Sequence, residues 1–150
     1  MKRKKNMERG ATKQQEYSVC LKKEYETRKV KLYSLFKNLT VFQLTGADII
    51  SCDFKKSGIF KLEFTNRGII SGHFIEIIKN KKIKLEWNVE GFGRENEYHT
   101  QVDFEITSEK EKSLLQLNHS KIKSKDLVPV KTKAWSEILD DLEEKLKGKS

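Results

Sequence analysis

The chain has 150 residues, of which 36% are hydrophobic and 35% charged, and its formal net charge is +9. This length suits a single domain with a substantial core. No stretch approaches the roughly 18 consecutive apolar residues that a membrane-spanning helix needs, so no membrane span is predicted.

Much of the positive charge lies at the start of the chain, where residues 1–13 hold six lysines and arginines against one acid, Glu8. We expect residues 1–15 to form a disordered basic tail and residues 16–150 to form one domain. Charge runs without interleaved aromatic residues are usually solvated, so no specific nucleic-acid partner is predicted.

The basic opening 1–5 is not followed by the apolar segment of a signal peptide, which argues against export. Cys20 and Cys52 are too few for a disulfide framework and suit a reducing compartment. We therefore expect a cytoplasmic protein.

The first part of the chain predicts a strand and two short helices. Residues 16–27 alternate as a strand, with Tyr17, Val19, Leu21 and Tyr25 on one face. Residues 28–38 have helical spacing, with inward positions at Val30, Tyr33, Leu35 and Phe36. Residues 40–46 form a helical turn with Thr40 as N-cap, Gly46 as its end, and an inward face of Val41, Phe42 and Leu44.

Six further strands are predicted after position 49, separated by turns such as those at 66–68 and 80–81. Residues 69–78 are apolar on both faces, so the pattern does not choose an inward side. The clear inward rows are Phe60, Leu62 and Phe64; Ile83, Leu85, Trp87 and Val89; Val102, Phe104 and Ile106; and Leu115, Leu117 and His119.

A long amphipathic helix closes the chain and begins between Asp126 and Lys131, with Pro129 in its first turn. Its apolar stripe is Trp135, Ile138, Leu139, Leu142 and Leu146. Its predicted solvent face is acidic and consists of Glu137, Asp140, Asp141, Glu143 and Glu144. The whole pattern predicts an α+β fold, in which this helix lies across a curved antiparallel sheet with a cavity between them.

The three histidines, His73, His99 and His119, fall on three different predicted elements without metal-ligand spacing. No metal site, cofactor or catalytic residue is predicted, and no nucleophile or phosphate-binding motif is present in the sequence. His119 shares a face with Leu115 and Leu117. It is interpreted as a buried histidine with a hydrogen-bond partner, with a polar handle for a ligand or an acid–base group as the alternatives.

Trp87 and Trp135 allow two interpretations as well. Each would bury a large apolar area in the core, and each could instead line a pocket for an apolar or aromatic ligand.

Several segments together resemble the activators of the heat-shock protein 90 ATPase, a family of the START-like superfamily. The segments are residues 31–33 (KLY), 57–60 (SGIF), 71–77 (SGHFIEI), 83–87 (IKLEW), 98–102 (YHTQV), 115–119 (LQLNH) and Trp135. The resemblance covers roughly residues 16–146 and implies a helix-grip fold: a curved antiparallel sheet around a long C-terminal helix, with two short helices after the first strand. The chain resembles only the C-terminal domain of the eukaryotic members, and Phe42 stands where the family often has tryptophan.

The resemblance implies a non-enzymatic protein that binds a small hydrophobic ligand in an internal cavity or a protein partner such as a chaperone. The alternative is a cyclase- or hydrolase-type enzyme that uses the same cavity. The residues expected to contact a ligand are Tyr25, Phe60, Leu62, Trp87, Phe104, Leu117, His119, Trp135 and Leu139.

Overall fold

The computed structural model describes residues 15–93 and 95–148, so all but the last residue of the predicted basic tail lies outside the described part. The described elements are β1 (Tyr17–Tyr25), α1 (Lys29–Lys37), α2 (Thr40–Leu44), β2 (Asp48–Cys52), β3 (Ile59–Phe64), β4 (Gly68–Ile78), β5 (Lys82–Gly91), β6 (Glu97–Glu109), β7 (Lys112–Ile122) and α3 (Leu127–Leu146). This is the predicted order: a strand, two short helices, six strands and a long helix.

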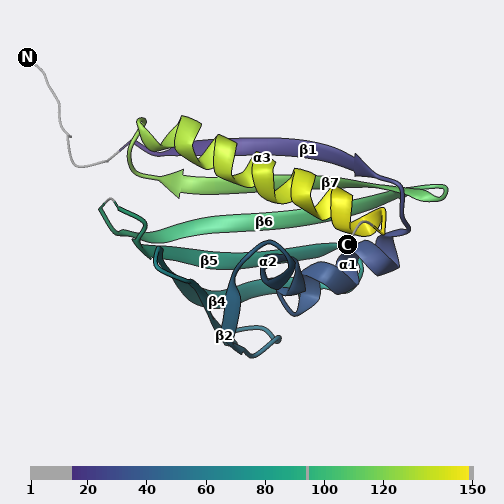
Figure 1. Ribbon diagram of the computed structural model, residues 1–150, viewed down its shortest axis with the longest axis horizontal. Helices are drawn as coiled ribbons and strands as arrows, with labels where there is room; N and C mark the ends of the chain where they lie inside the picture. Colours follow the sequence, from purple (N-terminus) through teal and green to yellow (C-terminus); the bar gives the residue numbers. More distant parts are fainter. Residues whose placement is uncertain (1–14, 94, 149–150) are drawn as a thin grey trace, which may run out of the picture.

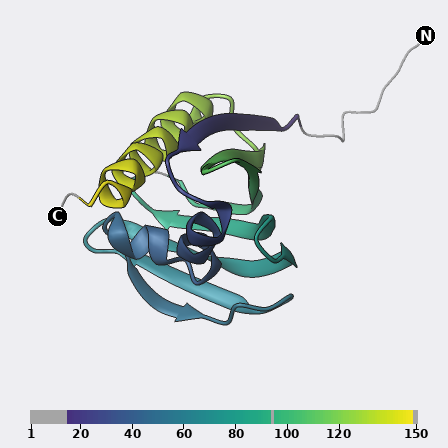
Figure 2. The same ribbon diagram turned by 90° about the vertical axis from the view of Figure 1, so that its right-hand side faces the viewer.

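The strands form one antiparallel sheet in the order β1-β7-β6-β5-β4-β3-β2. Figure 1 shows α3 running along the sheet above β7 and β6, and Figure 2 shows the sheet curving around it. Helix α1 packs on β6 and β7, while α2 contacts β2 and α3. The helix-grip fold expected from the sequence is confirmed.

The alternating rows form the strands because one face of the sheet is covered and the other meets water. In β5, Ile83, Leu85, Trp87 and Val89 are all at most 3% exposed, and the polar residues between them, Lys84, Glu86 and Asn88, face outward. For β4, whose inward side the sequence pattern did not choose, the structure shows that Ile70 and Phe74 are buried. Positive φ angles at Asn66 and Asn80 confirm the two turns predicted there.

The two short helices depart from the prediction in detail. Helix α1 buries Leu32, Tyr33 and Phe36, and Val30 is 59% exposed, because its position in the first turn falls to one side of that stripe. In α2, Leu44 ends the single turn and is 38% exposed. Thr40 is the first helical residue rather than the N-cap, since Leu39 precedes it in a left-handed conformation. The predictions for Val30, Thr40 and Leu44 were therefore wrong.

Helix α3 begins at Leu127, within the predicted interval, and buries Trp135, Leu139 and Leu142. No helix among the described residues is long and apolar enough to cross a membrane.

Side chains of strand β1 form a hydrogen bond and ion pairs with α3. The hydroxyl of Tyr25 donates a buried hydrogen bond to the carbonyl oxygen of Leu139 at 2.8 Å. The ammonium group of Lys23 lies 3.1 Å from a carboxylate oxygen of both Asp140 and Glu143. Two of the acids predicted to face solvent therefore belong to this contact, which fixes the distance between α3 and the edge of the sheet.

We expect Tyr25→Phe to lower the free energy of unfolding by about 1 kcal/mol, because it removes this hydrogen bond and keeps the ring. Urea denaturation checks the value, with Tyr17→Phe on the same strand as control. An equal loss in both variants would contradict a specific role for the Tyr25–Leu139 contact.

A candidate ligand cavity beneath the C-terminal helix

A cavity of about 460 Å³ lies between α3 and the sheet. Aromatic side chains from five parts of the chain form much of its wall: Phe42 of α2, Phe64 of β3, Trp87 of β5, Phe92 of the following loop, and Trp135 of α3. Helix α3 lines the cavity from Val130 to Asp141, about three turns. The cavity is thus an elongated, aromatic-walled space under the middle of α3.

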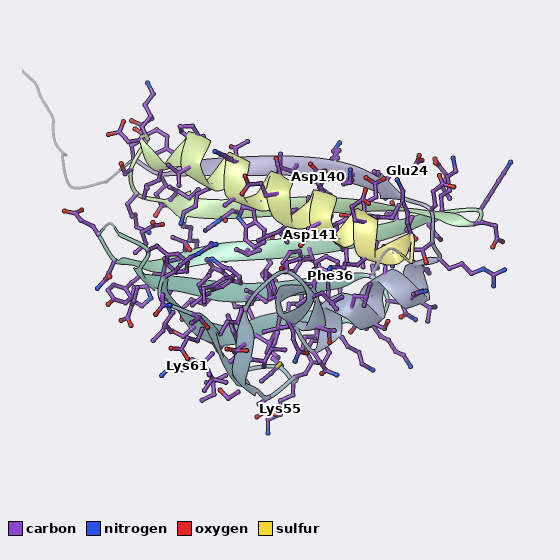
Figure 3. The ribbon with its side chains drawn as sticks, viewed as in Figure 1. Glu24, Phe36, Lys55, Lys61, Asp140 and Asp141 are labelled. Atoms are coloured by element: carbon purple, nitrogen blue, oxygen red, sulfur yellow. The ribbon has the colours of Figure 1, made fainter. Side chains whose placement is uncertain are left out.

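Three of the nine residues expected to contact a ligand line this cavity: Trp87, His119 and Trp135. The other six are buried side chains that do not line it: Tyr25, Phe60, Leu62, Phe104, Leu117 and Leu139. For Phe104 and Leu117, the reason is that α1 covers the inner face of β6 and β7. Phe36 of α1, labelled in Figure 3, packs on Phe104 with ring centroids 4.6 Å apart, so this part of the interior is filled.

At one end of the aromatic wall, the ring of Phe92 packs directly against Gly68. The ring of Phe92 lies so close to Gly68 that a Cβ there would come within 2.4 Å of it, and it also packs edge-on against Phe64 at 5.6 Å. A side chain at position 68 would therefore displace Phe92.

At the floor of the cavity, a chain of hydrogen bonds connects α3 to two strands. The indole N–H of Trp135 donates to Nδ1 of His119 at 3.0 Å. Nε2 of His119 lies 3.0 Å from Oγ1 of Thr100, whose hydroxyl donates to the carbonyl oxygen of Trp87. Because Nδ1 accepts, the proton of a neutral ring is on Nε2 and is donated to Thr100.

His119 therefore matches the interpretation of a buried histidine with hydrogen-bond partners. Both ring nitrogens are engaged, so the ring reaches the cavity without a nitrogen free to bond a ligand. Burial, together with the nearby charge of Lys131, lowers the pKa of His119 to about 3. The imidazole is neutral at physiological pH.

A buried ion pair lies beside this chain. Nζ of Lys131 on α3 is 3.1 Å from Oε1 of Glu97 on β6, and both side chains are less than 10% exposed. Strand β6 starts five residues before the predicted inward row at Val102, and an extra residue between the pairs Trp87↔Thr100 and Val89↔Glu97 forms a bulge. The bulge allows Glu97 to face inward while the next two side chains, Tyr98 and His99, are exposed.

Sequence reasoning missed Lys131 and the two cavity acids, Glu137 and Asp141. Lys131 lies four residues before Trp135, so the helical period could have placed it on the inner face. Glu137 and Asp141 were assigned to the solvent face; Glu137 is indeed exposed and Asp141 is half-buried, but both also line the cavity. Extending the stripe toward the helix N-terminus would have found only the lysine.

The two remaining histidines lie on the opposite, outer face of the sheet. Nδ1 of His73 and Nδ1 of His99 are 3.3 and 2.7 Å from the carboxylate oxygens of Glu86. Among the residues that the structure describes, no group of histidine, cysteine, aspartate and glutamate side chains is arranged to hold a metal ion.

The sheet, the long closing helix and the space between them define a START-like helix-grip domain. The model of one family, the Activator of Hsp90 ATPase homolog 1-like proteins, matches residues 33–147. The chain belongs to this family. A search of curated proteins found no match.

Solved structures share the fold at low identity. They include CalU16 from Micromonospora echinospora (17% identity, TM-score 0.66, covering 83% of this chain and 73% of that one). Aha1 from Colwellia psychrerythraea, solved as a dimer, has 16% identity and a TM-score of 0.70 over 85% of this chain and 94% of the other. MLL2253 from Mesorhizobium loti has 15% identity and a TM-score of 0.74 over 89% and 99%. At these identities the likeness shows the fold alone.

Proposed function

We propose that the protein binds a small, largely apolar molecule in the cavity beneath α3. The observation that carries the proposal is the cavity itself: its volume of about 460 Å³ falls in the range of ligand sites, roughly 300–1,000 Å³, and most of the residues that line it are apolar, five of them phenylalanine or tryptophan. A ligand that enters it gains about 25 cal/mol for each Å² of apolar surface removed from water.

We further propose that binding occurs without catalysis. A cyclase or hydrolase built on this cavity would need a group that can exchange a proton near neutral pH. His119 is the histidine that lines the cavity, and it is neutral, with both nitrogens in hydrogen bonds. A protein partner, including a chaperone, is the other function open to this family, and it would not require the cavity to be occupied.

Tryptophan fluorescence provides the test, because the only two tryptophans of the chain, Trp87 and Trp135, both line the cavity. A panel of fatty alcohols, sterols and flat aromatic compounds should contain members that change the emission saturably. A panel that leaves the emission unchanged throughout would contradict the proposal and favour the protein-partner function.

Filling the cavity should abolish this response. Ala134 lines the cavity, so Ala134→Phe is expected to weaken binding at least about ten-fold by occupying the space of the ligand. Lys133→Phe adds the same ring at the neighbouring position, which is also exposed but does not line the cavity, and should bind like the unmodified protein. Equal affinities of the two variants would place the ligand elsewhere.

A further inference from the structure

The charged side chains around the cavity include two carboxylates on α3. Glu137 and Asp141 are separated by one helical turn, and both line the cavity. Within residues 15–93 and 95–148, the cations that line it are Lys131, whose ammonium lies 3.1 Å from Glu97, and Arg67, which is exposed on the turn between β3 and β4. Because Glu97 pairs with Lys131, the charged groups left at the cavity among the described residues are these two carboxylates and Arg67.

The position of Asp141 differs from that of its neighbour. Asp140 lies on the β1 side of α3 and pairs with Lys23 at 3.1 Å. Asp141 lies on the side of α2 and lines the cavity with Thr45 and Phe42 (Figure 3). Within residues 15–93 and 95–148, neither Glu137 nor Asp141 forms an ion pair, so both are available to a ligand.

The aromatic wall is a second feature of the cavity that favours a cationic ligand. Phe42, Trp87 and Trp135 are in mutual contact, with ring centroids 5.2–6.0 Å apart. The face of an aromatic ring is electron-rich and attracts ammonium groups, most strongly for tryptophan and where water is excluded. A wall of this kind beside two carboxylates is suited to a cation that carries an apolar body, and it offers less to an anion.

We propose that the ligand of this cavity is an amphipathic cation: an apolar body against the aromatic wall and an amine or quaternary ammonium group beside Glu137 and Asp141. This inference rests on the proposed function, because it specifies the chemical class of the molecule bound in the same cavity.

Three probes of equal chain length separate the two proposals: decyltrimethylammonium, decanol and decanoate, each titrated below its micelle-forming concentration with tryptophan fluorescence as readout. Decyltrimethylammonium should bind more tightly than decanol, and decanoate least tightly. The net charge of the chain would by itself favour the anion, so a preference for the cation has to come from the cavity.

Charge variants test whether Glu137 and Asp141 cause the preference for the cation. The double variant Glu137→Gln with Asp141→Asn should weaken binding of the cation about ten-fold and leave decanol unchanged, because only the Coulomb attraction is lost. Asp140→Asn removes one charge at an adjacent position outside the cavity and should retain the preference. Arg67→Gln should strengthen binding of the cation.

Equal affinity for the three probes would overturn the cation inference and leave the proposed function standing. So would a cation preference that persists in the double variant. If none of the three probes binds, both proposals fail for ligands of this size.

Discussion

Trp135→Ala should lower the free energy of unfolding by about 3–5 kcal/mol, a large part of the stability of a small domain. Trp135 is 3% exposed, and its ring packs on Trp87 and Phe42 at centroid distances of 5.2 and 6.0 Å. The substitution also removes the donor to Nδ1 of His119 and leaves that nitrogen without its partner.

Chemical denaturation gives this value directly, and Trp135→Phe is the matched control. Phenylalanine retains most of the apolar contact and loses the N–H, so we expect a smaller loss, about 1–2 kcal/mol. A melting temperature of Trp135→Ala equal to that of the unmodified protein would mean that α3 does not pack through this residue.

The stability of the protein should fall as the pH is lowered below about 6.5, because of His119. Its pKa in the folded state is about 3, whereas the unfolded chain has the ordinary value near 6.5. Between these values the unfolded state binds one more proton, so stability is lost by about 1.4 kcal/mol per pH unit. The expected loss from His119 between pH 7 and pH 5 is therefore about 2 kcal/mol.

Urea denaturation at pH 7, 6 and 5 measures this slope. His119→Gln, which can still accept from Trp135 and donate to Thr100, should reduce the slope. An unchanged slope in His119→Gln would show that the His119 ring does not stay neutral in the folded protein.

The strands and α3 could be predicted because their patterns reflect a single physical requirement, that one face is buried. The row ending in His119 was placed correctly, since Leu115, Leu117 and His119 are all fully buried. Short helices offer fewer positions for a pattern, and Val30 and Leu44 were assigned to the wrong side for that reason.

The cavity could be predicted only in part, because its shape depends on which elements cover the sheet. Phe60, Phe104 and Trp87 all occupy inward positions, but α1 fills the space over Phe104 and leaves it open over Trp87. No periodicity distinguishes these cases. The ion pair of Glu97 and Lys131 also depends on a bulge in β6, which the polar stretch before Val102 does not reveal.

The measurement that tests the cavity as the ligand site most directly is NMR titration of ¹⁵N-labelled protein with the tightest-binding of the three decyl probes. We expect the indole resonances of Trp87 and Trp135 to shift, together with the amides of residues 130–141 and 64–70, while those of β1 stay in place. Shifts confined to the outer face around His73 and His99, or no shifts at saturating probe, would contradict a ligand site beneath α3.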